Sequence, residues 1–272
     1  MIENPLGKKI NFISNYDASL LFAIPRGINR AKIGIDEPFF GGFDVWNCYE
    51  FSYLNEKGKP ITKVLKIVCP ADSENIVESK SLKLYLTSFS MTTFEHQDDV
   101  LEVIKNDLSK ILNTRYIKLF FDTKDKFKYT TIPHNKLIDK LDVDIKEYNL
   151  NPSILQVTEN KKGKTIEKYS TLLKTNCPIT NQPDYGVVYI KYKSDFMITD
   201  ESLLKYIVSF RQYSDYHESC CEKIFFDIFN LIKPEFLVVK CFYTRRGGID
   251  INPQRFFPDT ENEDFYFHYW RQ

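Results

Sequence analysis

The chain contains an internal repeat, and this repeat constrains the fold more than any other feature. Residues 81–89 align without a gap to residues 202–210, and five of the nine positions are identical. The same offset of 121 residues brings His96 onto His217. A stripe of Leu, Tyr and Phe at helical spacing is common in helices that pack on a core, so the helix match alone is weak support. The agreement of the histidine and of the element order favours a duplication.

Each copy has the order strand, strand, helix, helix, strand. In the first copy we predict strands over 46–53, 63–68 and 116–121. Its two helices carry apolar stripes from Leu82 to Phe89 and from Val100 to Ile111. In the second copy we predict strands over 187–192 and 236–243, a helix over 200–211 and another helix that starts near His217. This order, in which runs of strands are followed by runs of helices, is typical of an α+β protein.

The same reading divides the chain into three parts. We predict a first module over 1–122, a connector over 123–165 and a second module over 166–272. The connector is charged and mixed in composition, and we expect it to contain a hairpin. The two modules differ where chemistry would be placed, which suggests one composite site at their junction, where ligand pockets often form.

The charge balance argues against several classes of partner. Lys plus Arg and Asp plus Glu number 37 each, and no basic stripe is interleaved with aromatic residues, so we expect no direct binding to nucleic acid. No charged leader precedes an apolar segment, and no apolar run approaches the roughly 20 residues of a membrane span. We expect a cytoplasmic protein whose six cysteines stay thiols, most of them filling the core.

One of these cysteines lies in a polar segment that is punctuated by proline. Pro178 keeps Cys177 out of the helical region of backbone space, and Asp184 follows seven residues later, directly after Pro183. Such loops seldom bury a sulfur as packing material, so Cys177 is a candidate nucleophile. Asp184 is a candidate acid, or else an ordinary turn residue. A neutral acid near pH 7 would need a raised pKa, and therefore burial.

Several further residues occupy positions that suit ligand binding. Glu78 and Glu218 are at predicted helix starts, where a carboxylate is also favoured simply by the helix dipole. Arg246 and Gly247 belong to an Arg-Arg-Gly-Gly turn, which would suit a phosphate or would be a solvated turn. No G-x-G-x-x-G motif follows a strand, so a Rossmann cofactor domain is not indicated.

Together these motifs resemble the long, two-module form of the NADPH-dependent 7-cyano-7-deazaguanine reductases, the nitrile reductases of queuosine biosynthesis. The resemblance rests on residues 78–85, 176–178, 182–184, 217–218 and 243–253, with a weaker likeness at 16–21 and 25–26. It implies tandem modules of the tunnelling fold, in which antiparallel sheets backed by paired helices assemble into barrels. It also implies the four-electron reduction of a deazapurine nitrile to an aminomethyl group with two NADPH.

The resemblance implies a role for each matching residue. Cys177 would form a covalent thioimidate with the nitrile carbon, and Asp184 would donate the proton. The substrate would be bound by Val77, Glu78, Ser79, His217 and Glu218, and NADPH by Ser79, Lys80, Arg246 and Gly247. No metal is implied, and we expect a homodimer or a larger homo-oligomer because half-barrels expose edge strands.

Two alternatives stay open. His217 and Cys221 are four residues apart on one helical face, a spacing that suits a metal, so a zinc-dependent hydrolase similar to the tunnelling-fold GTP cyclohydrolase I is the main enzymatic rival. No third ligand is evident for such a site. The other alternative is a purine-binding or assembly module whose cysteine is incidental.

Overall fold

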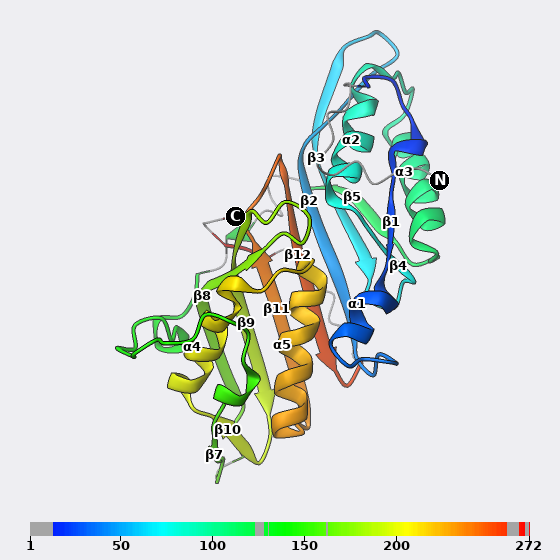
Figure 1. Ribbon diagram of the computed structural model, residues 1–272. Coiled ribbons are helices and arrows are strands. Elements are labelled where there is room, and N and C mark those ends of the chain that lie inside the picture. Colours follow the sequence, from blue (N-terminus) through cyan, green and yellow to red (C-terminus); the bar gives the residue numbers. More distant parts are fainter. Residues whose placement is uncertain (1–12, 123–127, 130, 162, 260–266, 270–271) are drawn as a thin grey trace.

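A single seven-stranded antiparallel sheet runs through the whole molecule (Figure 1). The computed structural model describes residues 13–122, 128–129, 131–161, 163–259, 267–269 and 272. The strand order is β5-β3-β2-β12-β11-β9-β8. These strands are β2 (Gly41–Leu54), β3 (Pro60–Pro70), β5 (Lys118–Asp122), β8 (Ile166–Asn176), β9 (Pro183–Lys193), β11 (Phe236–Tyr243) and β12 (Ile249–Phe257).

Short strands and helices complete the fold. The short strands are β1 (Ala23–Pro25), β4 (Asn75–Val77), β6 (Lys128–Tyr129), β7 (Val157–Glu159), β10 (Phe196–Ile198) and β13 (Phe267–His268). The helices are α1 (Arg26–Lys32), α2 (Ser79–Ser88), α3 (Gln97–Leu112), α4 (Asp200–Ser209) and α5 (His217–Ile232). Five single 3-10 turns cover Ala18–Leu20, Phe89–Met91, His134–Lys136, Pro152–Ile154 and Phe210–Gln212. No helix within the described part of the chain is long and apolar enough to cross a membrane.

The predicted repeat is confirmed by the element order. The first copy runs β2, β3, β4, α2, α3, β5, and the second runs β8, β9, β10, α4, α5, β11. Strand β12, the last strand of this sheet along the chain, pairs with β2 of the first copy and with β11 of the second, for example through Ile251↔Trp46 and Val239↔Arg255. This strand joins the two half-sheets, so that the copies lie side by side in Figure 1.

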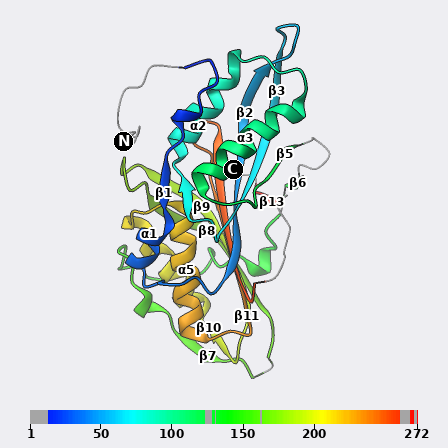
Figure 2. The same cartoon turned by 90° about the vertical axis from the view of Figure 1, so that its right-hand side faces the viewer.

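Alternation along the strands builds a separate apolar core in each copy. In β2, Trp46 and Cys48 face the helices, while Asn47 between them points to the other side of the sheet. The first core packs β2 and β3 against α2 and α3, and the second packs β9 and β11 against α4 and α5. Figure 2 shows β6 and β13 near the outer side of the sheet, away from α1 and α5. The division into modules at 122 and 165 stays a prediction.

The predicted match of the two histidines is wrong. The buried residues of α3 are Val100, Ile104, Leu108 and Leu112, and those at the same places in α5 are Cys220, Ile224, Ile228 and Ile232. This is an offset of 120, because the loop before α5 is one residue shorter than the loop before α3. His96 therefore precedes α3 and is exposed, whereas His217 is the first residue of α5. The buried stripe, rather than the histidine, fixes the helix register.

The predicted connector packs on the second copy. Ile138 and Leu155 lie in the second core, and Leu137 bridges to Tyr169. The hairpin expected in this segment is wrong: within the described residues, β6 pairs with β13 and β7 pairs with β10. Residues 123–127, 130 and 162 of the predicted connector lie outside the described part of the chain.

Candidate active site

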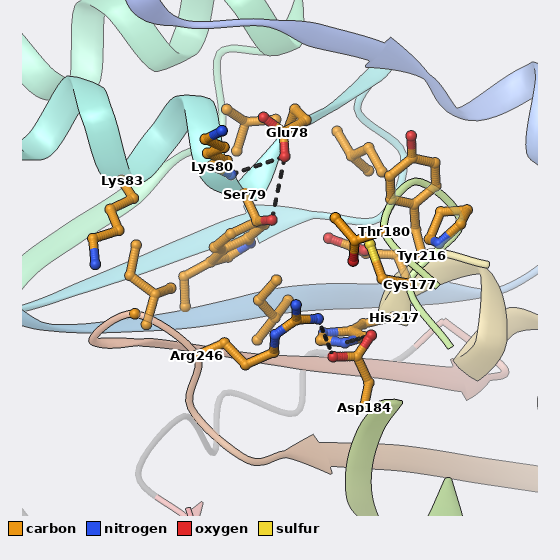
Figure 3. A pocket seen from close by; sticks show the side chains of 18 of the residues that line it. Glu78, Ser79, Lys80, Lys83, Cys177, Thr180, Asp184, Tyr216, His217 and Arg246 are labelled. Atoms are coloured by element: carbon orange, nitrogen blue, oxygen red, sulfur yellow. Dashed lines mark hydrogen bonds and ion pairs between the residues drawn. The ribbon is translucent and has the colours of Figure 1, made fainter. Parts of the chain in front are cut away.

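A cavity of about 520 Å³ lies where the two copies meet. Its lining includes the start of α2 from the first copy, and the end of β8, the start of β9 and the start of α5 from the second. The structure brings all ten predicted site residues to this one cavity: Val77, Glu78, Ser79, Lys80, Cys177, Asp184, His217, Glu218, Arg246 and Gly247. Figure 3 shows Cys177, Asp184 and His217 grouped on one side, with Glu78 and Lys80 across from them.

Cys177 is the accessible thiol of the molecule. It is partly exposed, and the other five cysteines are buried, in agreement with the prediction that most of them fill the core. The thiol follows the last residue of β8, and its backbone closes a tight loop: Cys177 N donates to Gln182 O at 2.9 Å, and Asn181 N donates to Cys177 O at 2.9 Å. Asn181 has φ of +54°, a conformation that asparagine tolerates well. The loop therefore presents the sulfur to the cavity on a fixed backbone.

Asp184 lies within β9, where it pairs with Thr175, so the reading of Asp184 as a turn residue is wrong. Its carboxylate is buried and accepts a hydrogen bond from Arg246 Nη1 at 2.6 Å, and His217 Nε2 lies 3.4 Å from its other oxygen. Burial alone raises the pKa of Asp184, but His217 and Arg246 outweigh that effect and hold the pKa below its ordinary value. The raised pKa expected for this residue is also wrong, because the contacts with His217 and with the Arg246 guanidinium stabilise the charged form.

Glu78 forms the N-terminal cap of α2. Its carboxylate accepts hydrogen bonds from Lys80 N at 2.8 Å and Ser81 N at 2.7 Å. The capping interpretation is therefore confirmed, and the same buried carboxylate lines the cavity. Burial raises the pKa of Glu78, and the backbone hydrogen bonds oppose that rise.

Glu218 is a buried carboxyl group with an unsatisfied oxygen. It is the second residue of α5 and only 4% exposed, and within the described residues its Oε1 has no hydrogen-bond partner. Burial, reinforced by the negative charge of Asp44, raises the pKa of Glu218 to about 8. A buried carboxyl oxygen without a donor is costly, and a ligand with N–H groups would satisfy it.

A buried ion-pair network packs behind Glu218, and the sequence reading did not find it. Arg255, fully buried, donates to Asp44 at 2.9 Å and to Glu222 at 2.8 Å. Arg26 pairs with Asp44 and Arg30 pairs with Glu222. The sequence did contain a signal for this network, because its charged residues occupy strand and helix positions that face the core. An unpaired charge at such a position would be too costly. The network ties α1, the sheet and α5 together beneath the cavity.

His217 is held by stacking. Its ring lies parallel to that of Tyr243, with centroids 3.7 Å apart and an angle of 5° between the planes. Cys221, its suggested partner for a metal, is buried in the second core, with its thiol against the carbonyl oxygens of Val239 and Pro253, and it does not line the cavity. Within the described residues, no group of three or more His, Cys, Asp and Glu side chains is arranged to hold a metal ion.

Cationic side chains also line the cavity. Lys80 and Arg246 were predicted there, and Lys83 joins them one helical turn after Lys80, a spacing that the sequence displayed. Gly247 has φ of +58°, and a side chain there would bring its Cβ within 2.8 Å of Lys83 Nζ. The glycine therefore keeps the turn close to this lysine. Gln182, Asp215 and Tyr216 also line the cavity and were not singled out.

Comparisons with known proteins give consistent matches along the chain. A family model described as "Nitrile reductase, 7-cyano-7-deazaguanine-reductase N-term" matches residues 12–119, and a model described as "QueF-like protein" matches residues 183–261. A protein of Chromohalobacter salexigens named NADPH-dependent 7-cyano-7-deazaguanine reductase is 41% identical over 93% of this chain and 91% of its own length. A protein of the same name from Burkholderia multivorans is 46% identical over 93% of this chain and 92% of its own length.

Proposed function

The chain belongs to the family of NADPH-dependent 7-cyano-7-deazaguanine reductases, and from this premise we propose that it reduces the nitrile of 7-cyano-7-deazaguanine to an aminomethyl group. This is a four-electron change, and each hydride carries two electrons, so the reaction consumes about two NADPH per substrate. The observation that supports the site assignment is the convergence of an accessible thiol, a paired carboxylate and an unsatisfied carboxyl group in one cavity. The product belongs to queuosine biosynthesis.

The first step is covalent. A nitrile carbon is a weak electrophile, and adding a sulfur nucleophile converts the triple bond into a C=N bond that accepts hydride more readily. The Cys177 sulfur forms a C–S bond to the nitrile carbon, one π bond of the nitrile breaks, and its electron pair takes up a proton on nitrogen. The result is a thioimidate on Cys177.

Asp184 handles the proton of this step. As a carboxylate, it accepts the proton that the Cys177 thiol loses, and it then donates that proton to the nitrile nitrogen. The thiol and the carboxylate share one proton throughout, so the step needs no external acid. The lowered pKa of Asp184 keeps it in the carboxylate form, the form that can accept this proton, and His217 orients the carboxylate from 3.4 Å.

Two glutamates recognise the deazapurine ring. The pyrimidine edge of such a ring presents N–H donors, and a carboxylate can accept two of them. Glu218 has a free buried oxygen for this purpose, and Glu78 faces the same cavity from the other copy. Val77, Ser79 and His217 complete the substrate contacts that we propose.

The cationic residues of the cavity fit a phosphate-bearing dinucleotide. Lys80, Lys83 and Arg246 supply cationic donors, and Gly247 allows close approach of the backbone. When bound, NADPH supplies the hydride. The residues Ser79, Lys80, Arg246 and Gly247 would hold it, and Lys83 extends this set.

The protein is also proposed to act as a homodimer or larger homo-oligomer in the cytoplasm. Strands β5 and β8 end the seven-stranded sheet, and such edges favour self-association. The six free thiols suit a reducing compartment. Light scattering coupled to size-exclusion chromatography tests the assembly.

One assay tests the reaction. Purified protein is mixed with 7-cyano-7-deazaguanine and NADPH, absorbance is followed at about 340 nm, and the product is identified by mass. We expect about two NADPH to be oxidised per amine formed. Without NADPH, intact-protein mass spectrometry should show one adduct, located on Cys177. Turnover with an unmodified Cys177 would refute the covalent step, and tight binding without turnover would refute the enzymatic assignment.

A further inference from the structure

Arg246 joins the two functional parts of the cavity. It lies in the turn between β11 and β12, which is closed by hydrogen bonds from Arg246 N to Ile249 O at 2.8 Å and from Ile249 N to Arg246 O at 3.2 Å. The guanidinium donates through Nη1 to Asp184 and through Nη2 to Gln182 Oε1 at 2.5 Å. Its side chain is 40% exposed, whereas that of Asp184 is 4% exposed. The arginine therefore covers the carboxylate from the open side of the cavity.

The same guanidinium has two competing partners. Under the proposed function, Arg246 also binds a phosphate of the dinucleotide. A phosphate is a multiply charged acceptor that matches the planar fork of arginine, so it competes directly with a single carboxylate for the same N–H groups. The backbone of the turn is fixed, but the exposed side chain can rotate from one acceptor to the other.

We propose that Arg246 is an exchangeable clamp, which holds Asp184 as a carboxylate in the free enzyme and moves to the dinucleotide phosphate when the cofactor binds. Cofactor occupancy thereby controls the proton on Asp184 and couples the hydride side of the cavity to the thiol side. This inference rests on the proposed function and deepens it, because it makes Arg246 a positioning residue for proton transfer as well as a binding residue.

The surroundings of Asp184 determine the direction of the effect. His217 on α5 faces the carboxylate directly, and Lys174 on β8 and Cys220 on α5 act on it from a greater distance. Lys174 Nζ instead donates hydrogen bonds to Asn176 Oδ1 and to the carbonyl oxygen of Arg211. Removing Arg246 leaves burial opposed mainly by His217, so the pKa of Asp184 rises. The carboxylate then takes the thiol proton more readily.

Formation of the Cys177 adduct reports this effect without any reduction. In the absence of NADPH, the acid limb of the rate of adduct formation follows the ionisation of Asp184, because below that pKa both the thiol and the carboxyl group keep their protons. For Arg246→Gln we expect the acid limb to move up by about one pH unit or more relative to the parent protein. Rapid-quench mass spectrometry between about pH 4 and pH 9 measures this limb.

Arg245 offers a matched control in the same turn. Its guanidinium stacks 4.0 Å from the ring of Tyr49 and donates to Gln272 O, and it does not line the cavity. Arg245→Gln removes the same charge one residue away and should leave the acid limb in place. Thermal unfolding of both variants checks that the fold is retained.

NADP⁺ serves as the non-reducing probe. Saturating NADP⁺ should move the acid limb of the parent protein upward, as Arg246→Gln does without it. An unchanged limb in Arg246→Gln, or an equal shift in Arg245→Gln, would overturn the inference and leave the proposed function intact. Absence of an adduct in all three proteins would instead refute the covalent step, and the clamp with it.

Discussion

The two copies of the repeat share their framework and differ where they face the cavity. Helices α2 and α4 have the same length, and each begins directly after a capping residue. That residue is Glu78 in the first copy and Thr199 in the second, and both accept hydrogen bonds from the first turn of their helix. Threonine is sufficient to cap the helix, so the fold does not explain why the first copy has a buried glutamate. The substrate contact that we propose for Glu78 would explain it.

The second helices show the same contrast. With the offset of 120 residues, Glu218 in α5 corresponds to Asp98 in α3. Asp98 is exposed and needs no partner beyond water, whereas Glu218 is buried beside the cavity. The two copies therefore have equivalent helix starts, and only that of the second copy is buried beside the cavity, where we propose that Glu218 binds the substrate. Four pairs of substitutions test this division, beginning with the largest expected effect.

The first test concerns the hairpin positions. Cys177 lies in the β8–β9 loop, and Glu56 is an exposed residue of the equivalent β2–β3 turn in the first copy. We expect Cys177→Ala to lower kcat by at least about 10³-fold and to abolish the adduct, because the covalent route is lost. Glu56→Ala should leave both unchanged. Residual nitrile reduction near the parent rate in Cys177→Ala would contradict the assignment.

The second test uses stability and pH. The pKa of Glu218 is raised from an ordinary 4.5 to about 8, so the folded state favours the protonated form. The contribution of the Glu218 carboxyl group to the free energy of unfolding is fully favourable below pH 4.5 and is lost as the pH rises towards 8. The free energy of unfolding of Glu218→Gln, taken relative to that of the parent protein, should therefore rise by on the order of 3 kcal/mol as the pH goes from 4.5 to 8. Urea unfolding measures this difference.

Asp98→Asn is the control for this pH effect. Because the carboxyl group of Asp98 is exposed, the difference in unfolding free energy between Asp98→Asn and the parent protein should not change with pH. If the difference in unfolding free energy between Glu218→Gln and the parent protein were also independent of pH, Glu218 would ionise as easily as a surface carboxylate.

The third test exchanges the caps. Glu78→Thr gives the first copy the cap of the second, so stability should change by less than about 1 kcal/mol. Loss of a buried charged acceptor for the substrate should cost about 2 kcal/mol or more, a rise of about 30-fold or more in the KM for the nitrile. Thr199→Glu should leave that KM unchanged. Equal effects of the two substitutions in steady-state kinetics would contradict the asymmetry.

The smallest effect is expected where the copies agree. Tyr85 OH donates to Asp107 at 2.7 Å, and Tyr206 OH donates to Asp227 at 2.6 Å. Tyr85→Phe and Tyr206→Phe should each cost about 1 kcal/mol in unfolding free energy without altering turnover. A change of turnover in only one of the two variants would show that the shared framework also differs in function.

The sequence alone determined the repeated framework and ten of the residues that line the cavity. Apolar stripes placed α2, α3, α4 and α5, and alternating residues placed most strands, because these patterns depend only on near neighbours in the chain. The proline-flanked loop identified Cys177 as the accessible thiol for the same local reason. Motif resemblance then named ten residues, all of which line the cavity.

Tertiary structure decided the charges and the register. Asp184 is held ionised by His217 and Arg246, which are 33 and 62 residues away in the chain, and Glu218 is made a weak acid by burial near Asp44. The true helix offset appeared only when the buried faces of α3 and α5 were known. Electrostatic energy depends on distance and on exclusion of water, and neither quantity exists until segments distant in sequence have packed together.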